Sequence, residues 1–164
     1  MRKLFFVAVA FACGTAQAQQ MVGDWIVSSM EGGHFAASKN DSGGFFGKYC
    51  YTSTDTCYWL MSSTLNCKEG AQIPVLVNAS SGAATVKVGC VPVGGTPRYV
   101  FLDHDLMDQL TTEGQQIGFA LPTESGQFRV TRFNINRTPA ALSALRQLIT
   151  RKPTTSGRTK DFSL

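Results

Sequence analysis

The stretch KYCYTSTDTCYWLMSSTLNC, residues 48–67, decides the fold, because it holds three of the five cysteines in the 164-residue chain. Aromatic residues, which favour strands, flank a polar break at residues 52–55. This pattern predicts a β-hairpin whose two arms bring Cys50 and Cys57 together across the turn.

The cysteine spacing favours structural disulfides over a metal or redox site. The intervals between Cys50, Cys57, Cys67 and Cys90 are seven, ten and twenty-three residues, whereas zinc sites and redox dithiols use close pairs such as CxxC. If Cys50 bonds to Cys57, then Cys67 and Cys90 close the next loop. Four cysteines allow three pairings, so this pairing is a preference among open alternatives.

The first 18 residues are typical of a cleaved secretory signal. Two basic residues precede an apolar run over residues 4–12, and the small-x-small sequence AQA ends at Ala18. The run is too short to span a membrane, so we expect cleavage after Ala18. Cleavage discards Cys13 and leaves an even number of cysteines, which suits a periplasmic or secreted protein.

Positive charge is concentrated at the carboxyl terminus. The whole chain carries a formal net charge of +4, whereas residues 19–150 hold nine basic and ten acidic side chains, a net charge of −1. A nucleic-acid-binding protein is expected to carry its basic surface on the folded domain, so this class is excluded. Residues 151–164 form a basic tail, which is either a solvated flexible end or a contact for an anionic envelope surface or partner.

The remaining sequence predicts one mainly β domain over residues 19–150, because this length suits a single core. Runs of β-branched and aromatic residues alternate with turn residues. We expect these further strands within residues 21–30, 34–38, 73–78, 83–90, 99–102, 117–121 and 128–135. Trp25 is expected to anchor the core. The pattern indicates an antiparallel β-sandwich or open barrel with two short helices, stapled by disulfides.

Capping signals place the two helices. Asp103 is a predicted N-cap, and Gly114 is the stop of a helix that carries Leu106, Met107 and Leu110 on one face. Thr138 is a predicted cap of the last helix. Pro139 follows at its first position, and leucines recur at helical spacing up to Ile149.

Few residues are candidates for catalysis. His34 lies in a Gly-rich turn, and His104 lies between Asp103 and Asp105, an arrangement that suits a base with an orienting carboxylate or part of a metal site. We favour the simpler interpretation, in which the carboxylates serve the start of a helix and His104 lies on its exposed face. No motif typical of a hydrolase accompanies them, so no catalytic residue, metal site or cofactor is predicted.

Aromatic and basic side chains are the possible binding residues. The exposed members of an aromatic set would suit a sugar ligand, and the tail would supply cations. The predicted set is Trp25, Tyr51, Trp59, Tyr99, Arg151, Lys152, Arg158 and Lys160.

The order of several short motifs resembles the invasion-associated locus B family. The motifs are Gly23-Asp24-Trp25, Cys57-Tyr58-Trp59, Gly89-Cys90, Leu106-Met107-Asp108-Gln109-Leu110 with Gly114, Ile117-Gly118-Phe119, Phe133, and Ala141-Leu142 with Leu145. The resemblance implies a protein of the Gram-negative envelope with a β-sandwich-like fold, linked to host-cell invasion and without an established catalytic activity. Family members usually carry a cysteine shortly after the first tryptophan, where this chain has Ser28 and Ser29.

These observations predict an exported, non-enzymatic interaction module that contacts an envelope or host protein or glycan. Peripheral contact with the envelope fits the tail, and the oligomeric state stays open. One alternative is an inhibitor of an envelope-degrading enzyme such as lysozyme. An alternative from another class is an envelope hydrolase that uses His104 with Asp103 or Asp105.

Overall fold

The computed structural model describes residues 19–63, 67–93 and 95–150. The predicted signal at residues 1–18 and the predicted tail at residues 151–164 lie outside the described residues. Ten strands and two helices are found within the described part of the chain. They are β1 (Gln20–Val22), β2 (Trp25–Met30), β3 (Gly33–Lys39), β4 (Phe45–Tyr51), β5 (Cys57–Ser62), β6 (Gln72–Ala79), β7 (Gly82–Val93), β8 (Thr96–Phe101), α1 (His104–Thr112), β9 (Gln116–Pro122), β10 (Phe128–Asn134) and α2 (Thr138–Thr150).

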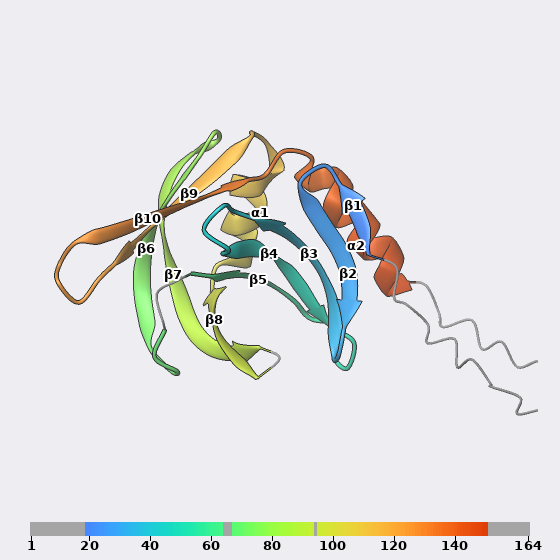
Figure 1. Cartoon of the computed structure of the whole chain (residues 1–164), viewed down its shortest axis with the longest axis horizontal. Helices are drawn as coiled ribbons and strands as arrows, with labels where there is room; N and C mark the ends of the chain where they lie inside the picture. The colour runs from blue at the N-terminus through green and yellow to red at the C-terminus, as the bar shows by residue number, and fades with distance from the viewer. Residues whose placement is uncertain (1–18, 64–66, 94, 151–164) are drawn as a thin grey trace, which may run out of the picture.

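All ten strands join one antiparallel sheet in the order β1-β2-β3-β4-β5-β8-β7-β6-β9-β10. The sheet curls, so that β2 to β5 face β6, β7, β9 and β10 across the core (Figure 1). The Phe46 ring on β4 lies 5.0 Å from the Phe119 ring on β9 and 5.8 Å from the Phe133 ring on β10. The predicted mainly antiparallel β fold with two short helices is confirmed.

The core is built on large aromatic side chains, as expected for Trp25. Trp25, Phe46 and Trp59 are fully buried. Phe46 stacks on Trp59 at 5.1 Å, and Trp25 meets Trp59 edge-on at 6.5 Å. The Trp25 indole N–H also donates to the Asn136 carbonyl over 3.1 Å, which satisfies its one polar atom. The prediction that Trp25 anchors the core is confirmed.

Both preferred disulfides are present. Cys50 and Cys57 are register partners on β4 and β5 and are bonded to each other. Cys67 is bonded to Cys90 on β7. The hairpin predicted from the polar break at residues 52–55 is therefore formed and cross-linked.

The amino-terminal part of the sheet contains one strand more than the sequence predicted. Gly23 adopts a φ of +61° and turns the chain between β1 and β2, which pair through Val22 and Trp25. A left-handed residue of this kind suits a tight hairpin. Residues 20–30 thus form two short strands, of which only the second was expected.

Helix α1 begins as predicted. The Asp103 side chain accepts a 3.0 Å hydrogen bond from the Leu106 N–H, the interaction that defines an N-cap. Gly114 follows the helix with a φ of +106°. Met107 and Leu110 are buried against the core.

Helix α2 begins differently from the prediction. Thr138 is the first helical residue, and its hydroxyl donates to the Ile135 carbonyl over 2.6 Å. The helical Ala141 N–H donates to the Arg137 carbonyl. The prediction that Thr138 caps the helix is wrong, because its hydroxyl ties the helix start to the end of β10. Neither helix among the described residues is long and apolar enough to cross a bilayer.

Candidate functional site

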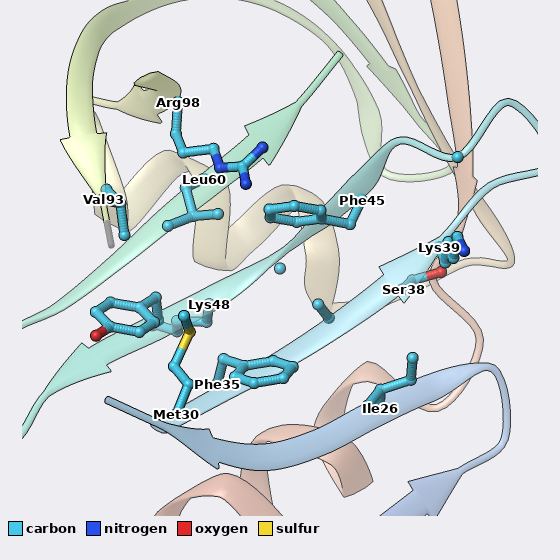
Figure 2. Close-up of a pocket in the computed structure, with 14 residues that line it drawn as sticks. Ile26, Met30, Phe35, Ser38, Lys39, Phe45, Lys48, Leu60, Val93 and Arg98 are labelled. Carbon is cyan, nitrogen blue, oxygen red and sulfur yellow. The ribbon is translucent and has the colours of Figure 1, made fainter. Parts of the chain in front are cut away.

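One concave site is a groove on the face of β2 to β5 that points away from the core, with β7 and β8 at its border. We call it the outer groove. It encloses about 420 Å³. Its apolar side chains are Ile26, Met30, Phe35, Ala37, Phe45, Leu60 and Val93. Figure 2 shows Phe35, Phe45 and Leu60 on the same side of the sheet.

Strand alternation explains why this face is apolar. Successive side chains of a strand point to opposite faces, so Phe46 enters the core and its neighbour Phe45 enters the outer groove. On β5, Leu60 likewise enters the outer groove, and its neighbour Trp59 enters the core. Tyr49 and Leu60 also belong to a second buried apolar cluster, separate from the main core. These strands therefore carry two apolar faces.

Small residues keep the middle of the outer groove open. Ala37 and Gly47 are register partners on β3 and β4, and both line the groove. A Cβ atom on Gly47 would collide with the Ala36 carbonyl and with the Ala37 backbone. Glycine at position 47 is therefore needed for the close approach of the two strands.

The charged border of the outer groove is cationic. The Arg98 guanidinium lies 4.6 Å from the centre of the Phe45 ring, a cation–π contact. Burial lowers the pKa of Arg98 from its usual value. Lys39 is exposed at the groove, and none of the described residues that line it is acidic. The groove thus suits an apolar group joined to an anion.

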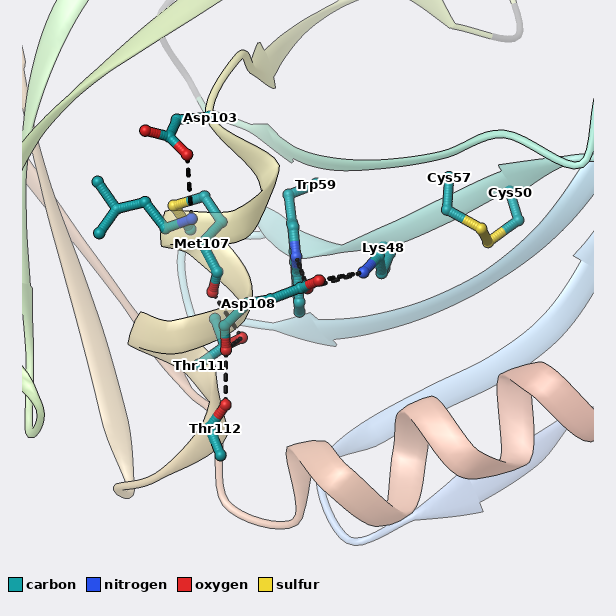
Figure 3. A network of polar contacts seen from close by, with 10 residues as sticks. Lys48, Cys50, Cys57, Trp59, Asp103, Met107, Asp108, Thr111 and Thr112 are labelled. Carbon is teal, nitrogen blue, oxygen red and sulfur yellow. Dashed lines mark hydrogen bonds and ion pairs between the residues drawn. A yellow bond between two sulfur atoms is a disulfide. The ribbon is translucent and has the colours of Figure 1, made fainter.

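A polar network lies where α1 meets the sheet (Figure 3). The Asp108 carboxylate accepts from the Lys48 ammonium at 2.7 and 3.1 Å and from the Trp59 indole N–H at 2.6 Å. Burial alone would raise the pKa of Asp108. The hydrogen bonds from Lys48 and Trp59, with the charges of Lys48 and His104, outweigh burial and lower this pKa. Because these donors occupy the carboxylate, the network serves as a link between helix and sheet.

The predicted pairing of His104 with a carboxylate is not formed. Asp103 is engaged as the helix cap, and Asp105 is exposed. His104 is half-buried beside the Tyr58 ring, 5.1 Å between centroids, rather than on an exposed face. Within the described ranges its Nδ1 atom has no hydrogen-bond partner. Among the described residues, neither Asp103 nor Asp105 is found hydrogen-bonded to His104.

The predicted aromatic binding residues differ in how far the structure exposes them. Trp25 and Trp59 are fully buried, and Tyr99 is 6% exposed, so these rings serve the core. Tyr51 is half-buried and meets the Tyr49 ring edge-on at 4.8 Å. The four predicted basic residues, Arg151, Lys152, Arg158 and Lys160, lie outside the described residues.

Sequence reasoning missed the outer groove. The available signal was the adjacent pair Phe45-Phe46, because two successive large apolar residues in a strand must point to opposite faces. Arg98 is distant in sequence and joins Phe45 only through the β5–β8 pairing. Within the described ranges no three His, Cys, Asp or Glu side chains gather as a metal site.

Comparisons with protein-family models, with curated proteins and with solved structures each give no match. The resemblance to the invasion-associated locus B family therefore stays a prediction.

Proposed function

We propose that the protein is an exported, non-enzymatic binding module of the bacterial envelope, and that its outer groove binds a single-chain anionic amphiphile. The observation that carries this proposal is an apolar groove that has the cations Arg98 and Lys39 and, among the described residues that line it, no acidic side chain. Export is supported by the signal-like residues 1–18 and by two disulfides.

The lining favours an aliphatic chain over a peptide or a glycan. A peptide brings backbone N–H and C=O groups that need hydrogen-bond partners when buried, and a glycan brings hydroxyls with the same need. The groove offers mostly carbon atoms, from Phe35, Phe45, Leu60 and their neighbours. An aliphatic chain has no such need and gains about 0.8 kcal/mol for each buried methylene.

The cationic border selects the head group. Arg98 is held over Phe45 and partly buried, so its position is fixed before binding. A carboxylate or phosphate can accept two hydrogen bonds from one guanidinium. The expected ligand thus places its chain across the strands and its anionic head at Arg98.

The test is calorimetric titration of the mature protein with dodecanoate below its micelle concentration. We expect saturable binding of dodecanoate and none of dodecyltrimethylammonium, which has the same chain and the opposite charge. The substitution Ala37→Phe should fill the groove and abolish binding. Thr85→Phe, at an exposed position of β7 outside the groove, is the matched control and should bind normally.

Arg98→Gln should weaken dodecanoate binding about tenfold through loss of a charge-assisted contact. Equal binding of the two amphiphiles, or unchanged affinity in the Ala37→Phe variant, would contradict the proposal.

A further inference from the structure

We infer that the free edge of β10 is a second binding site, which takes an extended acidic segment of a partner protein by strand addition. β10 ends the sheet. The β9–β10 hairpin projects beyond β6 at the left of Figure 1. Two of its side chains are largely exposed although apolar, Phe128 at 59% and Val130 at 52%.

The backbone of this edge is open toward solvent. In an antiparallel pair, residues alternate between those that bond to the partner strand and those whose N–H and C=O point away. Hydrogen bonds at both ends of the hairpin fix this alternation: Thr123 N–H to Gln127 C=O and Ile135 N–H to Gln115 C=O, each 2.8 Å. Gln127 and Ile135 both bond across the hairpin, and every second residue between them does the same. The odd-numbered residues of β10 therefore bond to β9. Phe128, Val130 and Arg132 therefore direct their backbone groups to the free edge.

At one of these three positions, Arg132, a side chain already bonds to the outward backbone carbonyl. The Asn40 side-chain amide donates to the Arg132 carbonyl over 3.3 Å and to the Thr131 hydroxyl over 2.9 Å. No such hydrogen bond is found at the outward backbone groups of Phe128 and Val130 within the described residues. The open part of the edge is thus the half nearest the hairpin turn.

An apolar row continues from this edge across the sheet. Val130 pairs with Ala120, and Ala120 pairs with Leu76. Leu76 is 49% exposed. A strand added beside β10 would extend this row. Its side chains on the same face as Val130 and Leu76 are therefore expected to be apolar.

Charge decides which strand fits. β10 contains Arg129 and Arg132 and no acidic residue. In a pairing of two copies centred between Phe128 and Val130, Arg129 would face Arg129 of the second copy, and like charges directly opposite one another are destabilising. Arg129 lies on the opposite face of β10 from Val130, because successive residues of a strand alternate between the two faces. Acidic side chains on that face of the incoming strand would lie beside Arg129. The occupant that fits is a segment in which apolar and acidic residues alternate.

The probe is the peptide acetyl-EVEVEVE-amide, titrated into the isotopically labelled mature chain and followed by NMR. We expect amide shifts at residues 128–131 and saturable binding. The charge-reversed peptide acetyl-KVKVKVK-amide should not bind. A form of the acidic peptide N-methylated at its valines lacks one row of N–H donors and should bind at least about tenfold more weakly.

Two variants distinguish the contribution of the β10 backbone to peptide binding from that of its side chains. Val130→Pro removes an outward N–H without removing a bond to β9, and Val130→Thr keeps that N–H. The first should lose binding at least about tenfold and the second no more than about threefold. Arg129→Glu should exchange the preference of the two peptides, which tests the site even if Val130→Pro fails to fold.

Several results would overturn the inference. They are absence of binding by the acidic peptide, equal binding of the basic peptide, shifts that map to the outer groove, and concentration-dependent self-association through β10. Ala37→Phe, which fills the outer groove, should leave peptide binding unchanged, so failure of the groove proposal and failure of this inference are distinguishable.

Discussion

The Asp108 carboxylate accepts a 2.6 Å hydrogen bond from the Trp59 indole N–H, and these residues lie 49 positions apart in the chain. Trp59 is fully buried, so this bond fixes α1 to a core side chain of β5. Lys48 completes the link with an ion pair to the same carboxylate. One surface carboxylate thus satisfies a buried indole and a largely buried ammonium.

Asp108→Asn is expected to destabilise the fold by about 1 kcal/mol. A hydrogen bond to a charged group contributes about 1.5–3 kcal/mol, and we reduce this value because the Asp108 side chain is about half exposed. The measurement is urea unfolding followed by Trp fluorescence. Asp41→Asn, at an exposed loop position, is the control and should change stability little. Equal effects of the two substitutions would show that the network contributes nothing.

The contribution of Asp108 should disappear at acid pH. Its pKa is lowered in the folded state, so the unfolded chain takes up the proton first as pH falls. The stabilisation is therefore fully present above the ordinary carboxyl pKa near 4 and is lost below it. Unfolding of the wild-type chain and Asp108→Asn, measured between about pH 7 and pH 2.5, should show two stabilities that converge. A constant difference across this range would contradict the assignment.

The two disulfides should contribute unequally. Cys50–Cys57 closes a separation of 7 residues and Cys67–Cys90 one of 23. From loop length alone, paired Cys→Ser replacement is expected to cost roughly 2.4 and 3.4 kcal/mol respectively. Chemical unfolding of the two double variants measures the order. A larger loss from the Cys50–Cys57 replacement would show that its role in the hairpin outweighs chain entropy.

Ser38→Ala should stabilise the protein. The Ser38 hydroxyl is fully buried between its register partners Trp25 and Phe46, and it has no hydrogen-bond partner within the described residues. An unsatisfied buried polar group costs about 1–3 kcal/mol, so its removal should raise stability by about 1 kcal/mol. Thermal unfolding provides the measurement, and Ser38→Val tests whether added volume reverses the gain.

Short sequence patterns predicted the features that depend only on residues close together in the chain. The polar break before Cys57 predicted the cross-linked hairpin, and Asp103 predicted the start of α1. Thr138 shows the limit of such reasoning, because its hydroxyl can either cap its own helix or bond backward to Ile135, and the sequence does not distinguish the two.

The outer groove required information that no single segment contains. Phe45 indicates a second apolar face, but its cationic border depends on Arg98 reaching it from β8. Likewise, the strands that form β9 and β10 were predicted, whereas the position of β10 at the sheet edge follows from the order of all ten strands. Strand order is set by tertiary packing, which short patterns do not encode.

The alternation of β3 and β4 also makes the protein a scaffold for engineering. Odd-numbered positions such as Phe35, Ala37 and Phe45 face the outer groove, and even-numbered positions such as Ala36 and Phe46 face the core. A library randomised at the odd positions, with Gly47 retained, would vary ligand preference while the core that folds the domain stays constant.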